Sequence, residues 1–204
     1  RIPGVKDAAV VNNLPLSGST TSIQMQGPDG APVLNSTRTV SPRYFSAMGI
    51  PLIAGRAFSD ADQAGTPPVW IVNEYLAHQL FPNRDPIGQP VPSGGNNNPA
   101  TVVGVVKNSS QTTYDQPVKG EVYIPYRQFI FGTFLSTIVI RTSGDPLSLA
   151  DTLRKEVWAV DPNQPILKIE TMNDVIADSI WRPRLSAWLF SGLGGLALLL
   201  TSAG

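Results

Sequence analysis

The sequence predicts an α+β fold that ends in the start of a transmembrane helix. Three observations support this prediction: a strand–helix–strand pattern over residues 134–170, several short strands around one helix between residues 41 and 128, and a run without charged residues from Leu185 to Gly204. Of the 204 residues, 42% are apolar, so the chain can bury a core. The 18 Gly and 19 Pro indicate many turns.

Composition excludes several classes of function. The 15 basic residues balance the 15 acidic residues, so the formal net charge is zero. Nucleic-acid binding depends on a basic surface that displaces counterions from phosphates, and we therefore expect no nucleic-acid partner. Because the chain contains no Cys, it has no disulfide, no thiolate nucleophile and no Cys-based zinc site.

The first forty residues predict three strands. Residues 5–12 contain a short apolar run that is typical of a buried strand. Residues 20–26 and 33–40 both have strand-compatible patterns, and the turn sequence Gly27-Pro28-Asp29-Gly30 lies between them. We therefore expect a hairpin over residues 20–40.

Two helices are predicted in the next part of the chain. The dipeptide Ser41-Pro42 provides an N-cap and a first-turn proline for a short helix that ends at Gly49. Further along, a strand over residues 69–72 leads into Asn73, which is the expected N-cap of a helix over residues 74–81. The apolar face predicted for this second helix consists of Leu76, Ala77, Leu80 and Phe81.

Short strands complete this part of the chain. The polar segment 93–99 is expected at the tip of a hairpin, directly before a buried strand over residues 101–106. Residues 121–124 form a further strand. Region 41–128 is therefore predicted to be a small β-rich unit with two helices.

The third region has the clearest pattern. Residues 134–142 are typical of a strand, and Asp145 and Pro146 then supply an N-cap and a proline at the first helical position. Apolar residues recur at helical spacing as far as Val160. Residues 166–170 are expected to return as a strand, which would complete a β-α-β unit.

A second helix follows the predicted β-α-β unit. Thr171 and Asp174 have the spacing of a capping box for a helix that continues to about Trp181. Pro183 lacks a backbone donor, so one straight helix through this position is not expected. We expect Pro183 in the first turn of the membrane helix instead, with only a residue or two between the two helices.

The charge-free run at the end predicts a membrane-spanning helix. Helical geometry gives residues 185–204 a length of about 30 Å, which matches the hydrocarbon core of a bilayer. Arg182 and Arg184 precede the run, and Trp181 and Trp188 lie near the same end, as expected at a head-group interface. A buried amphipathic helix is the alternative, but the run has no polar face. We expect the membrane helix to continue beyond the sequence given, and a first span or signal to precede it.

No residue pattern in the chain predicts an enzyme. The sequence has no Walker motif and no Gly-x-Ser-x-Gly elbow, and Gly192–Ala197 matches a dinucleotide fingerprint only inside the charge-free run. Asp60 and Asp62 resemble the start of a calcium loop whose later ligand positions are apolar. His78 lies one turn after Glu74, but a zinc site needs further ligands, so a solvated surface pair is expected. We predict no catalytic, cofactor-binding or metal-binding residue and no cofactor.

Several sequence blocks together resemble the extracytoplasmic core domain of MacB-type ABC transporter permeases, within the FtsX-like permease group. The order and spacing of these blocks are more specific than any single block, and their amino-acid sequences most resemble the branch called duplicated orphan permeases. The blocks are Val40-Ser-Pro-Arg-Tyr-Phe-Ser-Ala-Met-Gly-Ile-Pro-Leu-Ile-Ala-Gly-Arg-Ala-Phe58, Val69-Trp-Ile-Val-Asn-Glu-Tyr-Leu-Ala77, Leu80-Phe-Pro82 with Asp85-Pro-Ile-Gly88, and Val102-Val-Gly-Val-Val106.

This resemblance implies a particular domain organisation. A porter-like subdomain with the β-α-β unit would be built from residues 1–40 and 129–182. A mixed subdomain of helices and a small β-barrel, residues 41–128, would be inserted between its two parts. Residues 183–204 would begin the second of four membrane helices.

The resemblance also implies partners, a location and a function. Such permeases pair with a second permease copy, are driven by a cytoplasmic ABC ATPase domain or subunit, and sit in the inner membrane with this domain on the periplasmic side. A periplasmic adaptor is a partner for some members only, so its presence is left open. The expected function is non-enzymatic coupling of ATP hydrolysis to export or mechanical work outside the membrane. A membrane-tethered ligand-binding or adaptor module and a tethered hydrolase remain as alternatives.

Overall fold

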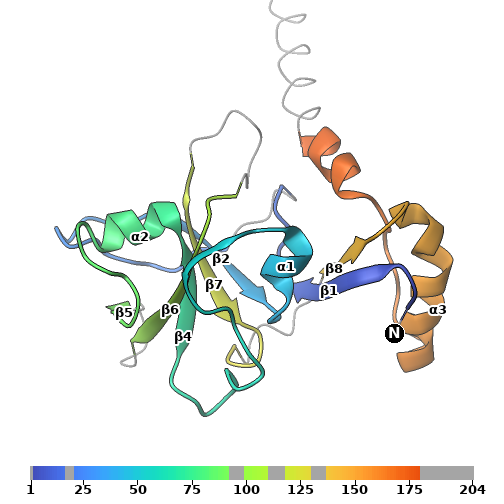
Figure 1. Ribbon diagram of the computed structural model, residues 1–204, viewed down its shortest axis with the longest axis horizontal. Helices are drawn as coiled ribbons and strands as arrows, with labels where there is room; N and C mark the ends of the chain where they lie inside the picture. The colour runs from blue at the N-terminus through green and yellow to red at the C-terminus, as the bar shows by residue number, and fades with distance from the viewer. Residues whose placement is uncertain (1, 17–20, 92–98, 110–117, 130–136, 180–204) are drawn as a thin grey trace, which may run out of the picture.

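The computed structural model describes residues 2–16, 21–91, 99–109, 118–129 and 137–179 (Figure 1). Within these residues, eight strands form one mixed sheet in the order β3-β6-β4-β7-β2-β1-β8, and β5 pairs with β6. The strands are β1 (Val5–Val11), β2 (Asn35–Val40), β3 (Leu52–Gly55), β4 (Val69–Asn73), β5 (Pro90–Val91), β6 (Ala100–Val106), β7 (Gly120–Pro125) and β8 (Thr137–Thr142). The helices are α1 (Tyr44–Met48), α2 (Glu74–Leu80) and α3 (Ala150–Val160), with the 3-10 turn η1 (Pro146–Leu149) before α3; residues 172–179 are also helical.

The sheet mixes parallel and antiparallel pairs. β2 pairs with β7 in parallel, as β4 does with β6, and the other neighbouring strands are antiparallel. Parallel neighbours are far apart in the sequence because each parallel pair needs a long crossover connection. The prediction of a mixed α and β fold is therefore confirmed.

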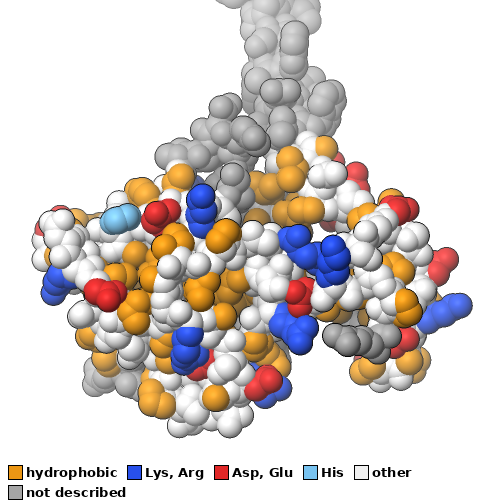
Figure 2. Space-filling model, in the orientation of Figure 1, with side chains coloured by type: hydrophobic (Ala, Val, Ile, Leu, Met, Phe, Trp, Pro, Cys, Tyr) orange, Lys and Arg blue, Asp and Glu red, His pale blue; other side chains and the backbone are white. Residues whose placement is uncertain are grey.

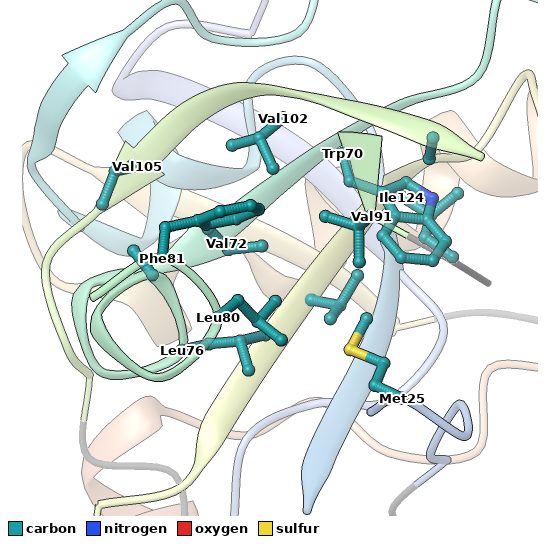
Figure 3. Packing of buried hydrophobic residues seen from close by; sticks show 13 residues of the cluster. Met25, Trp70, Val72, Leu76, Leu80, Phe81, Val91, Val102, Val105 and Ile124 are labelled. Carbon is teal, nitrogen blue, oxygen red and sulfur yellow. The ribbon is translucent and has the colours of Figure 1, made fainter. Parts of the chain in front are cut away.

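Two hydrophobic clusters lie on opposite faces of the central strands. Side chains alternate along β4, so Trp70 and Val72 belong to the cluster under α2, whereas Ile71 belongs to the cluster under α1. Figure 3 shows the first cluster, in which the predicted apolar face of α2 packs on the sheet. Burial on both faces explains why β4 is an apolar run without alternation.

Several local predictions are confirmed. Asn73 caps α2 by accepting a hydrogen bond from the backbone N–H of Leu76. Gly49 ends α1 in the left-handed conformation, with φ of 69°. Asp145 accepts from the N–H of Leu147 at the start of η1, with Pro146 in the first turn. The capping box between Thr171 and Asp174 is formed in both directions.

The hairpin predicted over residues 20–40 is present in a reduced form. Only the second arm is a full strand, β2, while the first arm makes isolated bridges from Thr21 to Thr37 and from Gln26 to Pro32. The backbone N–H of Gly27 donates to the carbonyl of Ala31 and closes the predicted turn. β5 and β6 pair as the arms of the second predicted hairpin, and its tip, residues 92–98, lies outside the described residues.

Two predictions were wrong. Ser41 does not cap α1: the N-cap is Arg43, and the Ser41 hydroxyl instead accepts from the backbone N–H of Val10 on β1. Residues 166–170 do not form the second strand of the β-α-β unit, and Leu167 is 95% exposed. Apolar residues in a short segment are not sufficient for a strand, because the backbone also needs a neighbouring strand, and no described strand pairs with this segment.

β2 is a polar strand that is completely buried. The six residues from Asn35 to Val40 are all buried, although five of them carry polar side chains. The side-chain amide of Asn35, for example, exchanges hydrogen bonds with the backbone of Ile23. Partners of this kind allow polar residues to occupy the middle of the sheet.

No helix among the described residues is long and apolar enough to cross a membrane. The predicted membrane run at residues 185–204, Pro183 and the end of the helix expected near Trp181 all lie outside the described residues.

Candidate functional site

The structure does not bring the titratable residues singled out in the sequence into one site. His78 is exposed on α2 and Glu74 is half-buried on the same helix. Asp62 is occupied by Arg56, whose Nη1 and Nη2 each donate to one carboxylate oxygen at 2.8 Å. Hydrogen bonds from Arg56 lower the pKa of Asp62, against the effect of burial. Among the described residues, no group of three His, Cys, Asp or Glu could hold a metal ion.

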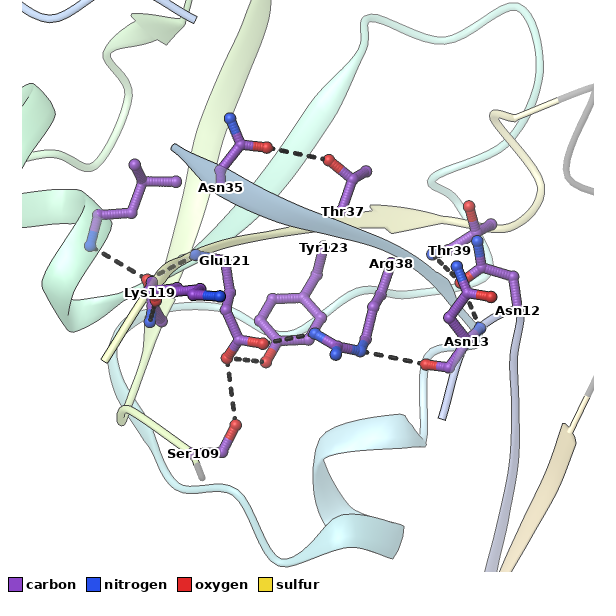
Figure 4. Close-up of polar contacts among 12 residues, drawn as sticks. Asn12, Asn13, Asn35, Thr37, Arg38, Thr39, Ser109, Lys119, Glu121 and Tyr123 are labelled. Atoms are coloured by element: carbon purple, nitrogen blue, oxygen red, sulfur yellow. Dashed lines mark hydrogen bonds and ion pairs between the residues drawn. The ribbon is translucent and has the colours of Figure 1, made fainter. Parts of the chain in front are cut away.

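A buried polar cluster that the sequence analysis missed links β2 to β7. Arg38 Nη1 lies 2.5 Å from Glu121 Oε1, and the two side chains are 3% and 0% exposed. Tyr123 and Ser109 donate their hydroxyl hydrogens to Glu121 Oε2 at 2.9 and 3.2 Å, and Arg38 Nε donates to the carbonyl oxygen of Asn13 (Figure 4). The long sequence separation between Arg38 and Glu121 left no local signal for this pair.

Burial determines the proton affinity of this cluster. It raises the pKa of Glu121, and the positive charge of Arg38 opposes this effect. It also raises the pKa of Tyr123 and of the neighbouring Tyr44, whose hydroxyl has no hydrogen-bond partner among the described residues. Because Arg38 and Glu121 are shielded from solvent, the cluster holds the parallel strands in register and offers no access for a substrate.

Asn73 joins α2 to β7, the strand that contains Glu121. Its Oδ1 accepts from the N–H of Leu76 and from the N–H of Glu121, and its Nδ2 donates to the carbonyl of Lys119. One side chain therefore caps the helix and satisfies two backbone groups beside β7. This arrangement fixes the position of the helix on the sheet.

A shallow depression lies where β3 meets β6. It has a volume of about 360 Å³ and is lined by Gly55, Arg56, Ile87, Gly88, Thr101, Val102 and Val103. Its one ionisable side chain, Arg56, is committed to Asp62. The depression therefore lacks the nucleophile, acid or base that a reaction would need.

The unit formed by β1, β8 and α3 has a different character from the rest of the molecule. It lies at one side in Figure 1, and no residue of α3 is fully buried. Val160 is 90% exposed, and Leu147 and Trp158 are about half exposed. The predicted apolar face of this helix is thus only partly covered, in contrast to the fully packed face of α2.

The segment between α3 and the helix at residues 172–179 is held by charges. Lys168 forms an ion pair with Glu170 and lies 3.7 Å from Asp178 of that helix. Val175 is the buried residue of the helix, and the capping box fixes where the helix begins. The candidate functional site is therefore the described segment over residues 161–179, which precedes the predicted membrane run in the sequence.

Comparison with known proteins shows the family to which the chain belongs. The family model of the MacB-like periplasmic core domain matches residues 1–156. The macrolide export ATP-binding/permease protein MacB of Azoarcus sp. (strain BH72) is 30% identical over 117 residues, and the pyoverdine export ATP-binding/permease protein PvdT of Pseudomonas syringae pv. tomato (strain ATCC BAA-871 / DC3000) is 29% identical over 114 residues. These matches cover 57% and 55% of this chain but 17% of each relative, so the chain spans a minor part of their length.

Two solved structures share the fold. The periplasmic region of MacB from Actinobacillus actinomycetemcomitans has a TM-score of 0.51 at 15% identity and covers 77% of this chain and 85% of that one. A domain assigned to a permease protein from Porphyromonas gingivalis has a TM-score of 0.51 at 16% identity, over 84% of this chain and 82% of that one. The resemblance found in the sequence blocks is confirmed, and the chain belongs to the family of MacB-like periplasmic core domains.

Proposed function

We propose that this chain is the periplasmic domain of an ABC transporter permease and that it transmits motion from the membrane to the space outside it. The observation that supports the proposal is the placement of the capped helix at residues 172–179. Only residues 180–184 separate this helix from the charge-free run. Because a connection of this length leaves little slack, a movement of the membrane helix is passed to the folded domain.

The proposal assigns the chemistry to other parts of the transporter. ATP is hydrolysed by a cytoplasmic ABC ATPase domain or subunit, and this domain acts as a non-enzymatic element on the periplasmic side of the inner membrane. Both curated relatives are described as ATP-binding/permease export proteins, which is consistent with this division. A second permease copy completes the assembly. A periplasmic adaptor is a partner for some members only, so it is not included in the proposal.

We also propose that the chain is divided into two subdomains and the start of a membrane helix. Residues 1–40 and 129–182 form the porter-like part, residues 41–128 the inserted part, and residues 183–204 the start of the membrane helix. Support comes from β1, β8 and α3, which lie together on one side of the molecule although they come from both ends of the chain (Figure 1). The two parts share one sheet, because β2 pairs with β7 along its whole length.

Lengthening the connection tests this function. A flexible Gly/Ser spacer inserted after Arg182 of the full-length protein should leave ATP hydrolysis intact and abolish the change in hydrogen exchange that ATP binding causes in the periplasmic domain. The same spacer placed in the polar segment 93–98, which is far from the connection in the sequence, is the matched control and should preserve the change.

Retention of the full ATP-dependent change in the spacer variant after Arg182 would argue against transmission through this connection. A tethered binding or adaptor module makes different predictions. It would show one membrane span in the complete protein, no response to ATP in the folded domain, and saturable binding of a ligand.

A further inference from the structure

The ribbon formed by β1 and β8 is attached to the main sheet at one point. β1 pairs with β8 at six positions, from Val5–Thr142 to Val11–Thr137, but it pairs with β2 only at Val11–Val40. β2, in contrast, pairs with β7 at all six of its residues. Within the described residues, the sheet is therefore continuous from β3 to β2 and narrows to a single residue pair before the ribbon.

Side chains reinforce this single crossing. The backbone N–H groups of Ser41 and Asn12 donate to the carbonyls of Val10 and Thr39 at 3.0 and 3.1 Å. In addition, Ser41 Oγ accepts from the N–H of Val10 and Asn12 Oδ1 accepts from the N–H of Thr39, both at 2.9 Å. Four hydrogen bonds thus surround the Val11–Val40 pair. Such a point resists separation of the strands, but it leaves rotation about itself less restrained than a ladder of six pairs would.

α1 provides the second attachment of the ribbon, through polar contacts at the surface. Asp7 of β1 accepts hydrogen bonds from Ser46 Oγ and from Arg43 Nη1, the latter at 3.1 Å, and Arg141 Nε of β8 donates to the carbonyl of Ala47 at 2.9 Å. The side chain of Arg43 is 70% exposed, and Figure 2 shows basic side chains gathered over α1 and the ribbon. We call the contacts of Asp7 with Arg43 and Ser46 the α1 latch.

The latch contains contacts that can be released. The hydrogen bond from Ser46 and the charges of Arg43 and Arg141 lower the pKa of Asp7, so the carboxylate is charged at neutral pH. Exposed ion pairs are weak because water competes for both charges. Below the latch, Ala9 and Val11 of β1 pack with Phe45 of α1 in the second hydrophobic cluster. The ribbon is thus held by one crossing, one patch of apolar contact, the hydrogen bond from Arg141 to Ala47 and one polar latch.

We propose that β1, β8, α3 and residues 161–179 turn as one body about the Val11–Val40 crossing, and that the α1 latch holds this body at its resting angle. A change of strand twist at the crossing would absorb the rotation, as a few residues do in known hinges. This inference concerns the folded chain alone and does not depend on coupling to ATP.

Distance measurements between two spin labels test the proposal on the full chain without nucleotide. Because these 204 residues contain no Cys, substitutions such as His78→Cys on α2 and Lys155→Cys on α3 place labels at exposed positions on either side of the crossing. The doubly labelled protein with an intact α1 latch should give one narrow distribution of distances between the two labels. Asp7→Ala should broaden and shift it, since the variant removes both latch contacts. Dilution with unlabelled protein removes distances between copies.

Matched variants separate the latch from general loss of structure. Asp151→Ala breaks an exposed ion pair with Arg154 within α3 and should leave the distribution unchanged. Labels at Lys6 and Lys155, which lie within the proposed body, should keep a narrow distribution in Asp7→Ala. If Asp7→Ala does not fold, Ser46→Ala removes one latch contact and carries the same test.

Two outcomes would overturn the proposal. One is a distance between α2 and α3 that is the same in Asp7→Ala, Ser46→Ala and the unaltered chain. The other is broadening of the Lys6–Lys155 distance, which would show that the ribbon and α3 do not move together. The distance measurement involves neither ATP hydrolysis nor transport, so its outcome does not depend on whether the proposed function is correct.

Discussion

At the scale of single residues, the most consequential feature is the ion pair between Arg38 and Glu121. Both charges are removed from water, and Tyr123 and Ser109 donate hydrogen bonds to the second oxygen of the carboxylate. A buried pair of this kind contributes little net stability compared with an apolar pair, but loss of one partner leaves an uncompensated charge. The pair therefore favours the correct register of β2 against β7 more than it favours folding as such.

The first prediction concerns loss of one charge. Arg38→Met should reduce the free energy of unfolding at pH 7 by about 3–5 kcal/mol, because the buried carboxyl group of Glu121 loses its cationic partner and must either stay charged without it or bind a proton. Without Arg38 the pKa of Glu121 rises further above its ordinary value of 4.5, so the protonated form is favoured in the folded state. The stability deficit should thus be smallest below pH 4.5 and grow as the pH rises. Urea unfolding at several pH values measures it.

Two further variants control this prediction. Arg38→Met combined with Glu121→Gln removes both charges and keeps an acceptor for Tyr123, so it should recover most of the loss. Arg154→Met breaks an exposed pair with Asp151 and should cost less than about 1 kcal/mol. A deficit in Arg38→Met that is independent of pH would contradict an origin in the buried carboxylate.

At the scale of elements, helices α2 and α3 show what decides whether a predicted helix is held in place. A predicted capping side chain precedes each of them, Asn73 at the start of α2 and Asp145 at the start of η1 before α3, and each has a predicted apolar face. Only α2 buries its face, and its cap, Asn73, also bonds to the backbone on both sides of residue 120 in β7. The shorter helix is therefore the better anchored one.

The second prediction tests this triple role of Asn73. Asn73→Ala should reduce the free energy of unfolding by about 3 kcal/mol, because it removes a cap and leaves the buried N–H of Glu121 and the carbonyl of Lys119 without this partner. Asp145→Ala removes the exposed cap of η1 and should cost about 1 kcal/mol. Thermal or urea unfolding compares the two variants. Equal losses would mean that Asn73 acts only as a helix cap.

At the scale of the whole molecule, stability is distributed unevenly. The central strands β4, β7 and β2 are buried along their whole length, whereas β1 buries only Ala9 and Val11 and β8 has no fully buried residue. The ribbon carries α3 and the connection towards the predicted membrane helix. The part of the domain that would receive motion is thus its least buried part.

The third prediction follows from this distribution. Backbone amides of β1, β8 and α3 should exchange with solvent at least about tenfold faster than those of β4, β7 and α2, because local opening there exposes less apolar surface. The comparison of helices is the sharper test, since length alone would favour the 11-residue α3 over the 7-residue α2. Hydrogen exchange followed by mass spectrometry or NMR measures this order. Slower exchange in α3 than in α2 would contradict it.

Local features were predicted well because their causes lie within a few residues. The cap at Asn73, the left-handed end of α1 at Gly49 and the capping box at Thr171 each depend on neighbouring backbone groups. The family resemblance was also available from the sequence, because it rests on blocks of consecutive residues. Because the sequence contains no recognisable reaction motif, the candidate site could be identified only from the structure.

Features that depend on distant partners could not be predicted in the same way. Ser41 has the spacing of a helix cap, but β1 arrives from another part of the chain and takes its hydroxyl. Residues 166–170 were expected to form a strand, yet no described strand pairs with them. The Arg38–Glu121 pair and the single Val11–Val40 crossing likewise join segments that no local pattern connects.

The sequence by itself thus determined the helices and most strands, the turns, the caps and the family of this protein, since these follow from short-range geometry and consecutive residues. Only the tertiary structure decided which polar residues are buried, which apolar face stays open and where the sheet narrows to one pair. Those properties depend on which strands become neighbours, and this depends on the free energy of packing the whole chain rather than on any segment of it.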